Sequence, residues 1–144
     1  MKKTNWARKT LESLEKNVWP ELSEMDKQDW LMVECNALRK KPIKDFTIEN
    51  LRQMIEQDIG LEFLIPVALE ELEQNILAEG ECYPGDLLCN VLRSDKNYWA
   101  THQKSWEKVC ALFKANEQLL QSFETTWEIR KLIFDRYARF SNLN

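Results

Sequence analysis

Carboxylates are the side chains in this sequence whose spacing could support chemistry. Glu70 and Glu73 are three residues apart, which places both on one face of a helix, and Glu79, Glu81 and Asp86 follow closely. Di-metal sites in helical bundles combine carboxylates with Glu-x-x-His pairs, and the sequence contains no such pair. We therefore expect these carboxylates to be solvated or to face a partner. A metal-dependent hydrolase that uses them is a less favoured alternative.

Potential nucleophiles lack the groups that would activate them. Catalysis by Ser or Cys usually needs a histidine base held by a third group, and the single histidine, His102, lies in a polar THQK stretch. There is no HExxH, GxGxxG or GK[ST] motif. The cysteines Cys35, Cys82, Cys89 and Cys110 match no zinc spacing, so we expect buried thiols, with a zinc site including His102 as a minor alternative. The sequence predicts no enzyme and no cofactor or metal.

Negative charge is concentrated in the middle third of the chain. Residues 45–86 carry one base, Arg52, and eleven carboxylates: Asp45, Glu49, Glu56, Asp58, Glu62, Glu70, Glu71, Glu73, Glu79, Glu81 and Asp86. The net charge of this segment is −10, while residues 1–44 and 87–144 each carry +3, and the whole chain carries −4. Such a field attracts and orients a basic partner and repels nucleic acid. A set of solvated helix faces is the simpler alternative.

Length and composition favour one compact all-α domain. The 144 residues fall within the roughly 100–200 typical of one domain, and three glycines and four prolines leave few tight turns for a β-protein. Charged residues occupy the place where a signal peptide would need its apolar run. The longest apolar run, Phe63–Leu69, is far below the ~20 residues needed to span a bilayer. We expect a single cytoplasmic domain over residues 1–144, a bundle of about six to seven helices with no membrane contact.

Two helices are predicted before residue 42. The first ends before Pro20, and the second is capped by Ser23 and ends at Arg39–Lys41 and Pro42. Their apolar positions are Trp6, Leu11, Leu14 and Val18 in the first and Trp30, Val33, Ala37 and Leu38 in the second. The cations Arg39–Lys41 suit the negative end of a helix dipole, so we do not interpret them as a nucleic-acid site.

Two further helices are predicted between Thr47 and Ile76. Thr47 is a good N-cap for the third helix, and Gly60 is expected to supply the left-handed residue after its end. Pro66 fits the first turn of the fourth helix, where its missing N–H costs nothing. The apolar positions are Ile48, Leu51, Ile55 and Ile59 in the third helix and Ala68, Leu72 and Ile76 in the fourth.

A loop is predicted over Glu79–Asp86. Its Tyr-Pro-Gly-Asp sequence places Pro84 and Gly85 at the central positions of a type II turn. Asp86 is then expected to cap a short helix with the apolar residues Leu87, Leu88, Val91 and Leu92. A turn containing Trp99, a long helix from about Gln103 through Phe123, and a last helix complete the chain. Thr125-x-x-Glu128 has the pattern of a capping box for that last helix.

The six tryptophans are expected to lie mainly in the core, because each occurs among aliphatic residues at helical spacing. Trp99 is the exception. It follows Tyr98 and lies just after the acidic segment, and aromatic side chains beside charge are common binding hot spots. We therefore assign Tyr98 and Trp99 to an interface.

The sequence between Asp45 and Trp99 resembles a known family. In order, it contains FTIENLR, QDIGLEFLIPVALEEL, NILAEG, YPGDLL and VLR, followed by the aromatic pair Tyr98-Trp99. This order is similar to that of the small immunity proteins of bacterial contact-dependent growth inhibition (CDI) systems. The resemblance is strongest over residues 45–99, and residues 1–41 and 100–144 show no matching pattern.

The resemblance implies an all-α immunity protein that binds the C-terminal toxin domain of a large surface protein and neutralises it in a 1:1 heterodimer. Such toxins are often nucleases with basic surfaces, which the acidic segment would suit. The residues that we expect to bind the toxin are Asp58, Glu62, Glu70, Glu71, Glu73, Glu79, Glu81, Tyr98 and Trp99. The alternative is an all-α adaptor or regulatory subunit whose acidic face binds an unrelated basic protein.

Overall fold

Helices account for all the regular structure of residues 5–144, the part of the chain that the computed structural model describes. The nine α-helices are α1 (Leu11–Glu15), α2 (Trp30–Leu38), α3 (Ile48–Glu56), α4 (Leu61–Gln74), α5 (Asp86–Arg93), α6 (Lys96–Ala100), α7 (Gln103–Ala115), α8 (Glu117–Ser122) and α9 (Trp127–Ser141). Short 3₁₀ helices cover Asn5–Arg8, Asp26–Gln28 and Ile43–Asp45. The all-α prediction is confirmed. The helix count exceeds the predicted six to seven, because the predicted long helix is divided into α7 and α8 and the predicted Trp99 turn forms the short helix α6.

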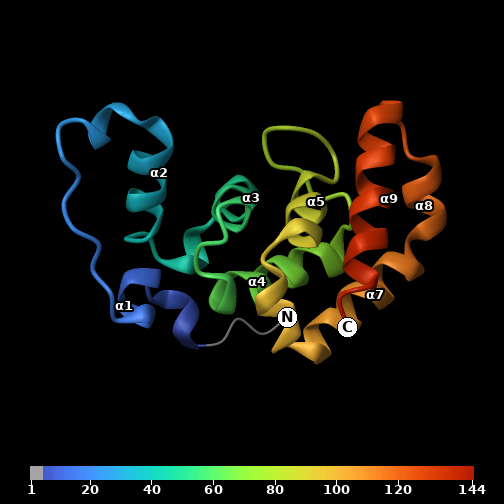
Figure 1. Ribbon diagram of the computed structural model, residues 1–144, viewed down its shortest axis with the longest axis horizontal. Helices are drawn as coiled ribbons and strands as arrows, with labels where there is room; N and C mark the ends of the chain where they lie inside the picture. Colours follow the sequence, from blue (N-terminus) through green and yellow to red (C-terminus); the bar gives the residue numbers. More distant parts are fainter. Residues whose placement is uncertain (1–4) are drawn as a thin grey trace.

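Helices α3, α4 and α5 form the centre of the molecule. Figure 1 shows α1 and α2 at one end and α7, α8 and α9 at the other, with α3–α5 between them. Helix α3 packs on α2, α4 and α5, while α5 packs on α9 and α4 packs on α7. A single cluster of buried apolar side chains connects these elements, from Leu11 through Leu64 and Leu88 to Phe140. The central helices therefore hold α1 and α2 on one side and α7 and α9 on the other.

Helix α3 begins as its sequence predicts. The side chain of Thr47 accepts from the N–H of Asn50, and the Asn50 side chain accepts from the N–H of Thr47, which forms a capping box. Leu51 and Ile55 are buried. The prediction for its end is wrong, because the left-handed residue after α3 is Asp58 (φ +56°), while Gly60 (φ +66°) lies immediately before α4.

Helix α4 begins earlier than predicted. Its first residue is Leu61, so Pro66 lies inside the helix rather than in its first turn. The side chain of Pro66 is exposed, and seven buried side chains on the opposite faces stabilise the helix despite the missing N–H: Leu61, Leu64, Ile65, Val67, Ala68, Leu69 and Leu72. Ala68 and Leu72 are buried as expected, and Ile76 is buried beyond the end of the helix.

The Tyr-Pro-Gly-Asp turn has the predicted geometry. The N–H of Asp86 donates to the carbonyl of Tyr83 (3.0 Å), and Gly85 has φ +91° and ψ 3°, as the third residue of a type II turn requires. The prediction that Asp86 caps α5 is wrong. Asp86 is the first residue of α5, and its carboxylate instead accepts hydrogen bonds from the preceding loop.

The N-terminal predictions fail where the chain leaves the helical conformation. Helix α1 ends at Glu15 because Lys16 is left-handed (φ +52°), and no helix continues toward Pro20. Ser23 accepts from the N–H of Asp26 at a 3₁₀ turn, and the N-cap of α2 is Asp29. The predicted inner face of α2 is also wrong, because Trp30, Val33 and Ala37 are exposed and only Leu38 is buried. Leu31, Cys35 and Leu38 face the core instead.

The C-terminal helices differ from the predictions at their boundaries. Helix α7 begins at Gln103 as expected, but the predicted long helix is interrupted at Asn116, after which α8 begins. The N-cap of α9 is Thr126, one residue after the predicted Thr125, and its side chain accepts from the N–H of Ile129 (3.2 Å).

Candidate functional site

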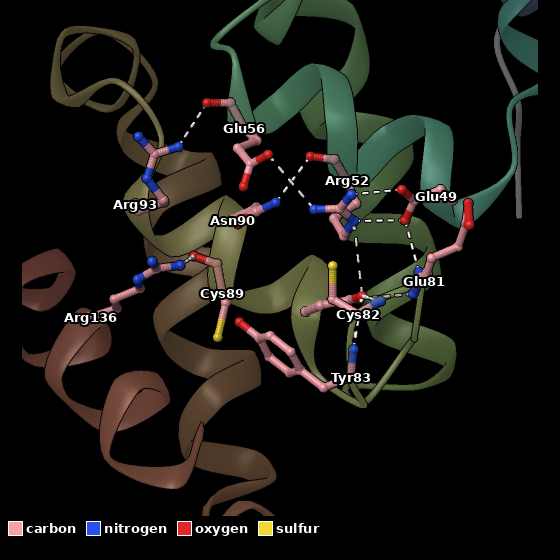
Figure 2. Close-up of polar contacts among 12 residues, drawn as sticks. Glu49, Arg52, Glu56, Glu81, Cys82, Tyr83, Cys89, Asn90, Arg93 and Arg136 are labelled. Carbon is pink, nitrogen blue, oxygen red and sulfur yellow. Dashed lines mark hydrogen bonds and ion pairs between the residues drawn. The ribbon is translucent and has the colours of Figure 1, made fainter. Parts of the chain in front are cut away.

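Arg52, the single base of the acidic segment, organises a cluster of carboxylates on α3. Its Nε and Nη2 atoms each donate to one oxygen of Glu49 at 2.6 Å, which is bidentate pairing. Its Nη1 atom lies 3.7 Å from Glu56, and its Nε atom lies 3.9 Å from Asp86. Figure 2 shows Glu49 and Glu56 on either side of the guanidinium, with Asn90 of α5 donating to the Arg52 carbonyl (3.0 Å). We call Glu49, Arg52, Glu56 and Asp86 the Arg52 cluster.

The Arg52 cluster fixes the backbone of the loop Glu79–Asp86, hereafter loop 79–86. Asp86 accepts from the N–H groups of Gly80 (2.8 Å), Cys82 (3.0 Å) and Tyr83 (3.3 Å), and Glu49 accepts from that of Glu81 (2.8 Å). Gly80 permits this close approach, because a Cβ atom there would lie 3.2 Å from the Cα atom of Glu49 and would also meet its carboxylate. Loop 79–86 is therefore held rigidly against the start of α3.

Pairing keeps the central groups of this cluster charged. The hydrogen bonds from Arg52 lower the pKa of Glu49, with a smaller contribution from the N–H of Glu81, and outweigh the opposing effect of burial. The same hydrogen bonds raise the pKa of Arg52. Three carboxylates thus surround one guanidinium, and the exposed Glu79 and Glu81 lie on the adjoining loop. Neither of these two forms an ion pair with a described residue. This part of the molecule is therefore strongly negative.

The acidic residues predicted to bind a partner do not all lie together. Glu81 contacts Glu49 at the start of α3, whereas Asp58 follows its end, and the nine residues of α3 separate these positions by about 13 Å. Asp58 accepts from the N–H of Asp95 (2.9 Å). Glu62 is exposed in the first turn of α4, where its charge acts on Tyr98.

The remaining predicted carboxylates lie toward the other end of α4. Glu70 and Glu71 are half-buried, and Glu73 forms an ion pair with Lys108 of α7. Glu73 therefore joins two helices, and its charge is partly neutralised. Of the residues predicted to bind the toxin, Glu79 and Glu81 lie together on loop 79–86, which the hydrogen bonds to Asp86 and Glu49 hold in place.

Trp99 of the aromatic pair Tyr98-Trp99 is packed into the core, which corrects its assignment to an exposed interface. Trp99 is 0% exposed, donates from Nε1 to the Ser94 hydroxyl (2.9 Å), and meets Phe140 edge to face. Tyr98 is half-buried and stacks on His102 with ring centroids 3.9 Å apart. Burial, aided by the charge of Glu62, raises the pKa of Tyr98 to about 12.

The cysteines do not have the properties of activated nucleophiles. The prediction of buried thiols is confirmed for Cys35 and Cys89, but Cys110 is half-buried and Cys82 is exposed. The pKa of each of the four thiols is raised, and desolvation is the largest cause in each. A nucleophilic cysteine usually has a lowered pKa. Among residues 5–144, no group of three or more His, Cys, Asp and Glu side chains is arranged to hold a metal ion. Within the same range, no helix is both long enough and apolar enough to cross a bilayer.

Comparison with known protein families decides the relationship that the sequence suggested. A family model described as CDI immunity proteins matches residues 13–109, about two thirds of the chain. The chain belongs to the CDI immunity proteins. The match extends beyond residues 45–99 in both directions, so it includes the end of α1 and all of α2, where the sequence showed no recognisable pattern. No curated protein and no solved structure gives a match.

This CDI immunity protein also exposes apolar side chains that the sequence reasoning missed. Five of the eight large apolar side chains exposed in the described residues lie between residues 18 and 33: Val18, Met25, Trp30, Met32 and Val33. We call this set the apolar segment 18–33. It lies within the family match. The Leu31–Cys35–Leu38 spacing of α2 is a signal that could have identified Trp30 as exposed, because these three residues define a different helix face.

Proposed function

We propose that this CDI immunity protein binds its cognate toxin domain in a 1:1 complex in the cytoplasm and neutralises it without catalysing a reaction. The family match carries this proposal. The −10 charge of residues 45–86 supports a basic partner, and a nuclease, which needs a basic surface to hold phosphates, has that property.

Loop 79–86 is the part of the acidic segment best suited to contact the toxin. Its backbone is fixed by Asp86 and Glu49, while Glu79 and Glu81 point their charges toward solvent. A loop that is already ordered loses little conformational freedom when a partner binds. The other exposed carboxylates, including Asp58 and Glu62, would add to the long-range attraction and thereby raise the association rate.

The apolar segment 18–33 would supply the affinity that charge does not. Trp30 is 65% exposed, and large aromatic side chains dominate binding energy when a partner desolvates them. In Figure 1, α2 and the loop before α5 both reach the upper edge of the view, on either side of α3. A single toxin domain placed across this edge would contact both.

The first experiment tests neutralisation itself. A candidate toxin domain is expressed in growing cells with and without the immunity protein, and the mass of the purified complex is measured. Restored growth and a 1:1 complex are expected. If the toxin stays active in the presence of the folded protein, the immunity function is wrong, and an adaptor for another basic protein becomes the better hypothesis.

The second experiment tests the role of loop 79–86. The association rate with the toxin is measured at low and high salt for the Glu79→Gln/Glu81→Gln variant. We expect slower association and a weaker dependence on salt. The Glu107→Gln/Glu124→Gln variant removes the same charge from exposed positions outside the acidic segment and serves as the control. Equal effects of the two variants would mean that only net charge matters. Replacement of Glu73 is less informative, because it also breaks the ion pair with Lys108.

A further inference from the structure

A cavity of about 420 Å³ lies between the end of α5, the start of α6 and the end of α9. Four basic side chains line it: Arg93, Lys96, Arg136 and Arg139. The acidic side chain in the lining is Asp95, and its carboxylate accepts from the N–H of Asn97 as the N-cap of α6 (2.9 Å). This cavity therefore carries a positive charge in a protein whose net charge is −4.

The four basic side chains lack acidic partners within the described residues. None of them belongs to the ion pairs found in that part of the chain. Acids outnumber bases in the sequence, 24 to 20, so composition alone does not favour four cations and a single carboxylate around one cavity. Like charges held close together repel, and an anion between them removes that cost.

Two of the guanidinium groups are held in place by the backbone. Arg93 donates from Nη1 to the carbonyl of Glu56 (2.7 Å), and Arg136 donates from Nη1 to the carbonyl of Cys89 (3.1 Å). Figure 2 shows both arginines on one side of α5 and Arg52 on the other. Each guanidinium has five N–H donors, so each retains donors for a ligand after making its backbone contact.

We infer that this cavity binds the phosphate group of a small molecule. A phosphate carries up to two negative charges and several acceptor oxygens, which suits a site with four cations better than the single charge of a carboxylate does. Leu92, Phe140 and Leu143 add an apolar wall on which the organic part of a phosphate ester could lie. The volume falls within the roughly 300–1,000 Å³ typical of small-molecule sites.

Calorimetric titration of the full-length protein with two probes tests this site. The probes are inorganic phosphate and adenosine 5′-monophosphate, each in low-salt chloride buffer. Saturable binding with one site per chain is expected. Equal affinity for the two probes would identify free phosphate as the ligand. Tighter binding of the nucleotide would identify a phosphate ester as the ligand, with its organic part in contact with the apolar wall. No saturable binding of either probe at millimolar concentration would overturn the inference.

Two double variants test whether the probes bind in this cavity. Among the described residues, the side chains of Lys96 and Arg139 do not donate to a backbone carbonyl as those of Arg93 and Arg136 do. Lys96→Gln/Arg139→Gln should therefore weaken binding at least tenfold with unchanged circular dichroism. Lys104→Gln/Lys114→Gln removes the same charge from exposed positions on α7 and should leave the affinity unchanged. Equal losses in both variants would overturn the inference. Binding of a single-stranded oligonucleotide through Lys96 and Arg139, without binding of either small probe, would also overturn it in favour of nucleic acid. The inference does not depend on toxin neutralisation, which is measured separately.

Discussion

The centre of the molecule and the apolar segment 18–33 differ in which side chains they bury. Around α3, the side chains of Arg52 and Glu49 are only 11% and 13% exposed, and that of Asp86 is 2% exposed. Beside α2, Trp30 and Met25 are mostly exposed. The first region thus removes charged groups from water, and the second leaves large apolar groups in it.

This difference separates the positions that maintain the fold from those available to a partner. The buried charges are paired with one another and with backbone N–H groups, which is the condition under which burial is tolerated. An exposed large apolar side chain forgoes roughly 1.5–3 kcal/mol that burial would provide. A binding partner can supply that burial. We therefore expect changes in the Arg52 cluster to act on stability and changes in the apolar segment 18–33 to act on binding.

The largest expected effect follows from removing the charge of Arg52. Arg52→Met should lower the free energy of unfolding by about 3–5 kcal/mol, because it leaves Glu49 and Asp86 buried beside each other without their cation. Urea unfolding measured by circular dichroism gives this change. Lys131→Gln, which breaks the exposed pair of Lys131 and Asp135, should cost at most about 1 kcal/mol. Similar losses in the two variants would mean that burial of the cluster does not matter.

Local sequence signals were sufficient for the start of α3 and for the turn before α5. The Thr47 N-cap and the type II turn at Pro84-Gly85 depend on residues close in sequence, and both were predicted correctly. The N-terminal part depends on what it packs against. The apolar residues Trp30 and Val33 fit one helix face and Leu31 and Cys35 fit another, and only contact with α3 selects the second.

The sequence predicted the negative charge of the candidate site but not the positions of its side chains. The sequence showed that carboxylates are concentrated in residues 45–86. It could not show that these groups are divided between the two ends of α3, because their positions depend on how the chain folds. The role of Asp86 also escaped prediction, because an aspartate before a helix fits an N-cap equally well. Trp99 was misassigned because it follows Tyr98 and lies just after the acidic segment, while Phe140, which packs against it, is distant in sequence.

The second prediction concerns binding. Trp30→Ala should weaken toxin binding by about 2 kcal/mol, roughly 30-fold, because a truncated aromatic anchor no longer fills its contact on the partner. Its stability should stay within about 0.5 kcal/mol of wild type, since the side chain is exposed. Trp127→Ala is the matched control, because Trp127 is equally exposed but lies on α9. If both variants bind like the wild type, the apolar segment 18–33 is not part of the interface.

The third prediction tests how loop 79–86 is held. Asp86→Asn should lower the free energy of unfolding by about 1–3 kcal/mol, because one amide NH₂ group would face a backbone N–H that now donates to a carboxylate oxygen. The exposed Asp45→Asn variant should change stability by no more than about 0.5 kcal/mol. Hydrogen exchange at Gly80 and Cys82 adds a local measurement, and unchanged protection there would contradict this role of Asp86.

The smallest effect is expected from the acid dependence of stability. The pKa of Glu49 is lowered in the folded protein, chiefly by its hydrogen bonds from Arg52, from an ordinary value of 4.5. A group of this kind stabilises the fold above its unfolded-state pKa, and that contribution is lost as the pH falls through the folded-state pKa. Glu49→Gln should therefore show a smaller decrease in unfolding free energy between pH 7 and pH 3 than the wild type.

The same measurement on a double variant identifies the cause of this acid dependence. With Arg52→Met already present, adding Glu49→Gln should change the difference between pH 7 and pH 3 much less, because the cation that lowers the pKa of Glu49 is gone. The effect is expected to be smaller than that of Arg52→Met alone, because glutamine removes the charge at position 49 instead of leaving it buried without its cation. If Glu49→Gln reduces the acid dependence equally with and without Arg52, the backbone N–H of Glu81 rather than the guanidinium would be the main cause, and the bond between loop 79–86 and α3 would matter more than the ion pair.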